Sequence, residues 1–122
     1  MTNARNTGIY GRVNPGPGFG DEYSYTDDVV LTAAQEGAVI NNAGAVKPIT
    51  ITLPAAIAGR EFAIQRIAPY GISVYPSGSE KISDGGNGVA AVLLSRGLLV
   101  VSCSADGSWE VVTDSAVWNF EQ

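Results

Sequence analysis

The chain lacks the residue type on which most enzyme and metal sites depend, because none of its 122 residues is histidine. Histidine is the usual general base, the usual activator of a serine or cysteine nucleophile and the commonest metal ligand. The single cysteine, Cys103, cannot form a disulfide within the chain, and its place in an apolar run favours a buried small side chain over a reactive thiol. The sequence therefore predicts no serine or cysteine triad.

Three other patterns could support chemistry, but each has a simpler explanation. The carboxylate pairs at 21–22 and 27–28 could act in glycoside hydrolysis, yet adjacent acids in a polar segment are usually only solvated. The glycines within 16–20 follow no buried strand and open no helix, unlike those of a phosphate-binding loop. The loop at 83–87 offers oxygen ligands for calcium without a bidentate glutamate at the right distance. We expect a non-enzymatic protein with no catalytic residue, no cofactor and no metal.

The charge and the hydropathy of the chain restrict its partners. The formal net charge is −5, so the long-range field repels nucleic acid and anionic membranes. The N-terminus has no apolar signal segment, and no run reaches the ~18 apolar residues of a membrane helix. Hydrophobic residues make up 45% of the chain and charged residues only 16%, which predicts more than one buried face.

The first 28 residues differ in composition from the rest of the chain. They hold five glycines and two prolines, and their only aliphatic side chains larger than alanine are Ile9 and Val13. Such a segment cannot form a core, and its prolines and glycines favour an extended, irregular backbone. Its aromatic residues favour an arm that lies along a neighbouring subunit, with a disordered tail as the alternative. We therefore predict an arm at 1–28 and a β-domain at 29–122, and the expected contact residues of the arm are Tyr10, Phe19, Tyr23 and Tyr25.

The remaining chain reads as nine or ten short strands separated by turns. The segment 49–53 alternates apolar residues with threonine, Pro54 would begin one helical turn reaching Gly59, and Ile64 is expected to pair with Val74 across a reversal at 68–71. In the final hairpin, a three-residue loop at 105–107 best separates apolar from polar residues on the two faces. This loop sets Val101 against Val111 and Ser102 against Glu110. The pattern predicts an all-β fold: an antiparallel β-sandwich or jelly-roll-like barrel with one short helical turn.

One stretch, 89–103, does not alternate cleanly, which predicts that both of its faces are covered. One face can belong to the core, and the other needs the arm, a second sheet or another subunit. Two aromatic residues near the C-terminus are also too large to leave in water. The predicted oligomer interface consists of Val92, Leu94, Leu98, Val100, Trp118 and Phe120.

Six segments follow one another in a recognisable order and spacing. They are Ile51-Thr52-Leu53-Pro54-Ala55-Ala56, Ala58-Gly59-Arg60, Phe62-Ala63-Ile64, Val74-Tyr75-Pro76-Ser77-Gly78, Glu80-Lys81-Ile82 and Asp106-Gly107-Ser108-Trp109. Together they resemble a module that recurs in virion proteins of tailed bacteriophages, both capsid decoration (cement) proteins and tail-fibre segments.

The resemblance covers about half of the chain and implies a β-rich homotrimer on the capsid surface of a virion, assembled in the host cytoplasm and bound to the major capsid protein. It supplies no catalytic residue. The alternative is a tail-fibre or receptor-binding module that recognises host glycans through Tyr70 and Tyr75, although strand tyrosines are more often packing residues.

Overall fold

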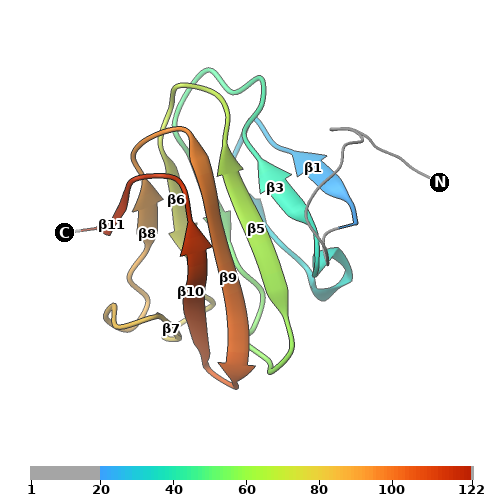
Figure 1. The fold of residues 1–122 in the computed structure, drawn as a ribbon, viewed down its shortest axis with the longest axis vertical. Helices are drawn as coiled ribbons and strands as arrows, with labels where there is room; N and C mark the ends of the chain where they lie inside the picture. The colour runs from blue at the N-terminus through green and yellow to red at the C-terminus, as the bar shows by residue number, and fades with distance from the viewer. Residues whose placement is uncertain (1–19, 122) are drawn as a thin grey trace.

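The computed structural model describes residues 20–121, and these are almost entirely β-structure, as expected from the sequence (Figure 1). Short runs rich in β-branched and apolar residues form the strands, and segments rich in Gly, Asn and Ser form the turns. The elements in chain order are β1 (Glu22–Ser24), β2 (Val29–Val30), the 3₁₀ helix η1 (Ala33–Gln35), β3 (Val39–Asn41), β4 (Ile49–Thr52), β5 (Glu61–Arg66), β6 (Ile72–Tyr75), β7 (Lys81–Ile82), β8 (Ala91–Leu93), β9 (Gly97–Ala105), β10 (Ser108–Asp114) and β11 (Trp118–Phe120).

The described strands form two sheets. The six-stranded sheet has the order β1-β3-β5-β9-β10-β7, and the five-stranded sheet has the order β11-β8-β6-β4-β2. From β1 to β6 each strand lies in the opposite sheet from the one before it, so the chain winds between the two layers as in a solenoid (Figure 1). The later strands then complete both sheets.

The expectation of antiparallel sheets was wrong for much of the molecule, because five of the nine strand pairs are parallel. Parallel neighbours need a crossover connection, and from β1 to β6 this crossover passes through the opposite sheet. For the same reason the expected pairing of Ile64 with Val74 does not form. The segment 67–71 carries the chain from one sheet to the other, so Ile64 pairs with Ile40 and Leu99, and Val74 pairs with Ile51 and Ala91.

The core lies between the two sheets and is built from the alternating residues of both. Phe62 and Ile64 of β5 and Ile72 and Val74 of β6 all have 0% exposure. Trp109 joins them from β10, with its ring centroid 5.9 Å from that of Phe62. Burial of these large apolar side chains is the main stabilising contribution, at about 1.5–3 kcal/mol each for aliphatic residues and Phe.

The helical turn expected from Pro54 to Gly59 is absent, and the helical segment of the described chain is η1 instead. Two backbone N–H groups of this stretch bond to side chains of other loops, and the Gly59 N–H bonds to the Cys103 carbonyl. The Ala56 N–H donates to Glu80 Oε1 at 2.9 Å, and the Ala58 N–H donates to Asp106 Oδ1 at 2.9 Å. Long-range partners have therefore replaced local helical ones.

The last hairpin has the predicted register through a different turn. Val101 pairs with Val111 and Ser102 pairs with Glu110, as expected, but Ser108 pairs with Ala105, so the loop has two residues rather than three. An irregularity between Ser108 and Glu110 restores the register. The extra residue lies in a β-bulge at Cys103 and Ser104 of β9, opposite Trp109 of β10, rather than in the turn.

Residues 1–19, most of the predicted arm, lie outside the described residues, and the rest of that segment enters the fold. Strand β1 pairs in parallel with β3, with Glu22 opposite Val39 and Tyr23 opposite Ile40. In residues 20–121 no helix is long and apolar enough to cross a membrane.

Candidate functional site

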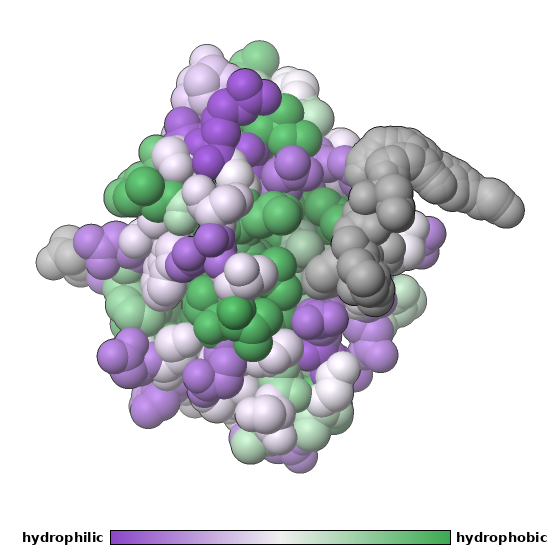
Figure 2. All heavy atoms as spheres, in the orientation of Figure 1, coloured by the Kyte–Doolittle hydropathy of each residue, from purple (hydrophilic) through white to green (hydrophobic). Residues whose placement is uncertain are grey.

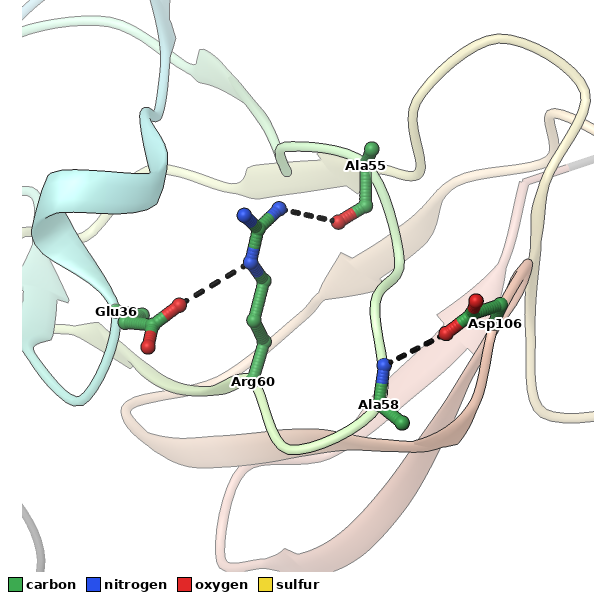
Figure 3. Close-up of polar contacts among 5 residues, drawn as sticks. All are labelled: Glu36, Ala55, Ala58, Arg60 and Asp106. Atoms are coloured by element: carbon green, nitrogen blue, oxygen red, sulfur yellow. Dashed lines mark hydrogen bonds and ion pairs between the residues drawn. The ribbon is translucent and has the colours of Figure 1, made fainter.

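The segments that carry the phage resemblance meet at one end of the molecule, around the loop at 53–60, which we name the anchored loop. Figure 3 shows its polar contacts: Arg60 Nε donates to Glu36 Oε2 at 3.1 Å, Arg60 Nη1 donates to the Ala55 carbonyl at 2.8 Å, and the Ala58 N–H donates to Asp106. The arginine thus ties the loop to the segment after η1, and the aspartate ties it to the β9–β10 turn.

Backbone bonds complete the anchored loop. The Gly59 N–H donates to the Cys103 carbonyl at 2.7 Å, the Cys103 N–H donates to the Arg60 carbonyl at 2.9 Å, and the Gly107 N–H donates to the Ala56 carbonyl at 2.9 Å. The charged side chains of the network bond to each other or to backbone groups. This arrangement fixes the position of the loop. In residues 20–121 no cluster of side chains has the composition of a metal site.

The outward face of the six-stranded sheet carries an apolar strip. Val39, Ala63 and Val100 form a buried cluster separate from the main core, and Leu98 packs against it. They lie side by side on β3, β5 and β9, since Val39 pairs with Ala63 and Ala63 pairs with Val100. We name these four residues the outward strip. Figure 2 shows hydrophobic residues gathered at the centre of this face, with hydrophilic residues at its margins.

Acidic side chains lie on both sides of the outward strip. Glu61 and Glu110 both pair with Ser102 of β9, so they share its face, and Glu22 pairs with Val39. Burial raises the pKa of the Glu22 carboxyl above its ordinary value, and the hydrogen bond that Asn41 Nδ2 donates at 2.5 Å only partly opposes this rise. The face is therefore apolar in the middle and anionic at the margins.

A second apolar area lies where β8 ends and β11 begins. Leu94 and Val117 are 53% and 63% exposed, and the Leu94 N–H donates to the Val117 carbonyl at 2.7 Å. We name these two residues the edge patch. Beside them the rings of Trp118 and Phe120 meet edge to face at 5.1 Å, and Trp118 Nε1 donates to Asp114 Oδ2 at 2.7 Å. Both rings pack against the core and are half-buried, as expected for aromatic residues docked on the domain.

The six predicted interface residues thus do not form one surface. Leu98 and Val100 belong to the outward strip, Leu94 to the edge patch, and Trp118 and Phe120 to the sheet edge beside it. Val92 has an outward position on the five-stranded sheet, since its neighbours Ala91 and Leu93 on β8 are buried in the core. Val39 was missed as a member of an outward apolar surface, and its signal was that it interrupts alternation in the run 38–40. Alternation with Phe62 and Ile64 places Ala63 on the outward face, as predicted from the sequence.

The other face, the outward side of the five-stranded sheet, is mainly polar. Thr50 pairs with Ser73 and Thr52 pairs with Tyr75, alternating along β4 and β6 with the buried core residues. The Tyr75 hydroxyl donates to Glu121 Oε2 at 2.8 Å, and this bond, with a smaller effect of burial, holds the pKa of Tyr75 above its ordinary value. Hydroxyl groups and one aromatic ring thus cover β4 and β6 on this side, and Val30 of β2 and Val92 of β8 flank them.

Of the four predicted arm contacts, two can be placed. Tyr23 and Tyr25 are half-buried and pack against the main core, and the Tyr25 hydroxyl accepts a hydrogen bond from Gln35 Nε2 at 2.7 Å. Tyr10 and Phe19 lie outside the described residues. The two placed tyrosines contribute to the packing of the domain itself.

No protein-family model matches the chain, and a search of curated proteins finds no match to it.

Proposed function

We propose that the chain is a non-enzymatic structural protein of a phage virion, a homotrimeric capsid decoration protein that binds the major capsid protein and stabilises the shell. In finer detail, we propose that its two sheets act as a sandwich-like block with outward surfaces free for assembly. The support for this assignment is the order of the segments that resemble the phage module. Several of these segments contact one another around the anchored loop. Such a protein needs shape and adhesive surface rather than reactive groups.

The observation that carries the proposal is the edge patch. Two neighbouring aliphatic side chains stay more than half exposed although the domain has a complete core between its sheets. Exposed apolar area that is not needed for the core favours a contact with another protein. We assign the edge patch, with Trp118 and Phe120 beside it, to the contact between copies.

The test is the oligomeric state of the full chain, followed by capsid binding. Native mass spectrometry at micromolar concentration should give a trimer, and replacing Leu94 and Val117 with serine should give a monomer that remains folded. Ile57→Ser is the matched control, because Ile57 is 46% exposed but lies in the anchored loop, at the opposite end of β9 from the edge patch. A wild-type monomer would refute the trimer. Expanded capsids without decoration protein should bind the wild type and lose their contents at a higher temperature; an absence of binding would refute the capsid assignment.

A second candidate is a tail-fibre or receptor-binding module for host glycans, favoured by the arrangement around Tyr75. Its ring lies on the polar outward face with Ser73 beside it on β6 and the Glu121 carboxylate bonded to its hydroxyl. Sugars bind to such combinations of an aromatic ring and hydrogen-bonding groups. Glycan-array binding that is lost in Tyr75→Ala and kept in Tyr70→Ala would support this candidate, whereas no binding of the wild type would exclude it.

A further inference from the structure

We propose that the edge patch of one copy meets strand β2 of the next copy, with Val117 opposite Val30, so that the five-stranded sheets of three copies join edge to edge in a ring. The inference rests on the proposed homotrimer and adds the surface that receives the edge patch. A three-fold ring needs such a second surface, because its contacts are heterologous, whereas a patch that binds its own equivalent produces a two-fold dimer. The counterpart of the edge patch therefore lies elsewhere on the chain.

Strand β2 carries an exposed apolar side chain at the other edge of the same sheet. The strand order β11-β8-β6-β4-β2 puts the edge patch and β2 at opposite edges. Val30 is 68% exposed and pairs with Thr52 on the outward face, whereas Val29 packs against the core. An edge strand with an exposed apolar residue is suited to pairing with a strand of another chain.

The free edge of β11 presents backbone groups for such pairing. The Leu94 N–H donates to the Val117 carbonyl, and the Glu121 N–H donates to the Ala90 carbonyl. Every second residue of this segment, starting at Val117, therefore bonds to the β8 side. The N–H and C=O of Trp118 lie between these bonds and point away from β8, because successive residues of a strand direct their backbone groups to opposite sides.

The free edge of β2 presents the complementary groups. The Leu31 N–H donates to the Thr52 carbonyl at 2.8 Å, so by the same alternation the N–H and C=O of Val30 point away from β4. When Val30 lies opposite Val117 of the next copy, the Trp118 N–H reaches the Val30 carbonyl. Both valine side chains then lie on the outward face and contact each other.

The strand directions fit a ring. Strand β11 is antiparallel to β8, β8 is antiparallel to β6, and β6, β4 and β2 are parallel to one another. Strands β11 and β2 therefore run in the same direction. Rotation about an axis along the strands preserves this direction, so β11 and β2 of neighbouring copies meet as a parallel pair without any reversal of the chain.

Charges at one end of the contact are complementary. In this register Asp28, two residues before Val30, lies beside the turn that follows β8. That turn adjoins the start of β11, since the Val117 N–H donates to Ser95 Oγ at 2.8 Å, and its next residue is Arg96. Arg96 is exposed, and neither of the two ion pairs formed within residues 20–121 includes it. An ion pair between Arg96 and Asp28 of the next copy would fix the register.

The test is disulfide formation between Val30→Cys and Val117→Cys in the same full chain, with Cys103 retained because it is buried. Directly opposite residues of paired strands have Cα atoms about 4.8 Å apart, within the range of a disulfide. Within one copy the two positions lie four strand spacings apart, about 19 Å, so this disulfide joins two copies. We expect mild oxidation to give covalent trimers in non-reducing electrophoresis, with the linked peptides identified by mass spectrometry.

Two control variants separate this contact from others. Val117→Cys alone should give no crosslink, and covalent dimers of that variant would overturn the pairing with β2. Ile57→Cys combined with Val117→Cys should also give none, because Ile57 is exposed at the opposite end of β9, and a crosslink would contradict the register. A native trimer without the disulfide between positions 30 and 117 would overturn this inference alone, whereas a wild-type monomer would overturn the proposed trimer as well.

Charge removal tests the ion pair. Arg96→Gln should raise the dissociation constant by a factor of about 1.4 to 5 for each contact between copies, as expected for an exposed ion pair. Lys81→Gln removes the same charge from an exposed position of β7, beside the β9–β10 turn, and should leave the dissociation constant unchanged. Equal effects of the two substitutions in dilution series followed by native mass spectrometry would refute the ion pair.

Discussion

Replacement of Asn42 by alanine should destabilise the fold more than any other single polar substitution considered for this protein. Asn42 has 0% exposure, and its side chain holds the crossing between β5 and β6. Its Oδ1 accepts hydrogen bonds from the backbone N–H groups of Ile67 at 2.8 Å and Ala68 at 3.0 Å, and its Nδ2 donates to the Tyr70 carbonyl at 3.2 Å. The alanine variant leaves all three backbone groups without their partner.

The magnitude follows from the burial of those groups. An unsatisfied buried polar group costs about 1–3 kcal/mol, and only the bond to Ala68 is fully buried, so water can reach the other two groups in part. We expect a loss of about 3 kcal/mol in the free energy of unfolding. That corresponds to a fall of roughly 10–15 °C in the melting temperature for a domain of about 100 residues.

Urea unfolding followed by tryptophan fluorescence provides the assay, because Trp109 is completely buried in the folded protein. The midpoint should fall while the dependence on urea concentration stays constant, as expected when stability changes and the surface exposed on unfolding does not. Asn87→Ala, in an exposed loop, is the control and should change stability by less than about 0.5 kcal/mol. A loss below about 1 kcal/mol for Asn42→Ala would mean that the crossing does not depend on this side chain.

Two other predictions concern the backbone and the pH dependence of stability. Gly97→Ala should lower the free energy of unfolding by about 2 kcal/mol or more, because Gly97 has φ +136° and an added Cβ would lie 2.7 Å from the Ala116 nitrogen. The control is Gly71→Ala, where an added Cβ meets only ordinary contacts. Equal midpoints of urea unfolding for the two variants would contradict this prediction. The raised pKa of Glu22 means that the folded state holds this proton more tightly than the unfolded state. The stability that Glu22 contributes is therefore present below the ordinary pKa of 4.5 and is lost as pH rises through the pKa of the folded state. Unfolding experiments at several pH values should show that Glu22→Gln removes this decline in stability. A pH profile of the variant identical to that of the wild type would exclude a contribution of Glu22.

The anchored loop brings together segments that are far apart in the sequence. Asp106 lies 46 positions after Arg60 and accepts a hydrogen bond from the Ala58 N–H, while Arg60 donates to the Ala55 carbonyl. The two side chains together satisfy backbone groups of one loop.

The sequence by itself determined most of the strands after residue 28 and which of their side chains point inward, whereas strand β1 at Glu22–Ser24 was not predicted. Alternation placed Ile49, Ile51 and Leu53 in the core, and all three are at most 2% exposed. The separation of apolar from polar residues on the two faces of the last hairpin also predicted the pairing of Val101 with Val111 correctly. These features are local, because successive side chains of a strand point to opposite faces whatever strand lies beside it.

Only the tertiary structure decided which strands are neighbours. Val39 pairs with Ala63, and Ala63 pairs with Val100, across separations that no local pattern encodes. Backbone hydrogen bonds between strands are nearly independent of side-chain identity, so alternation reveals the face of a residue and not its partner. The outward strip exists only through these pairings, because one apolar residue of β3, one of β5 and two of β9 come together when these strands lie side by side.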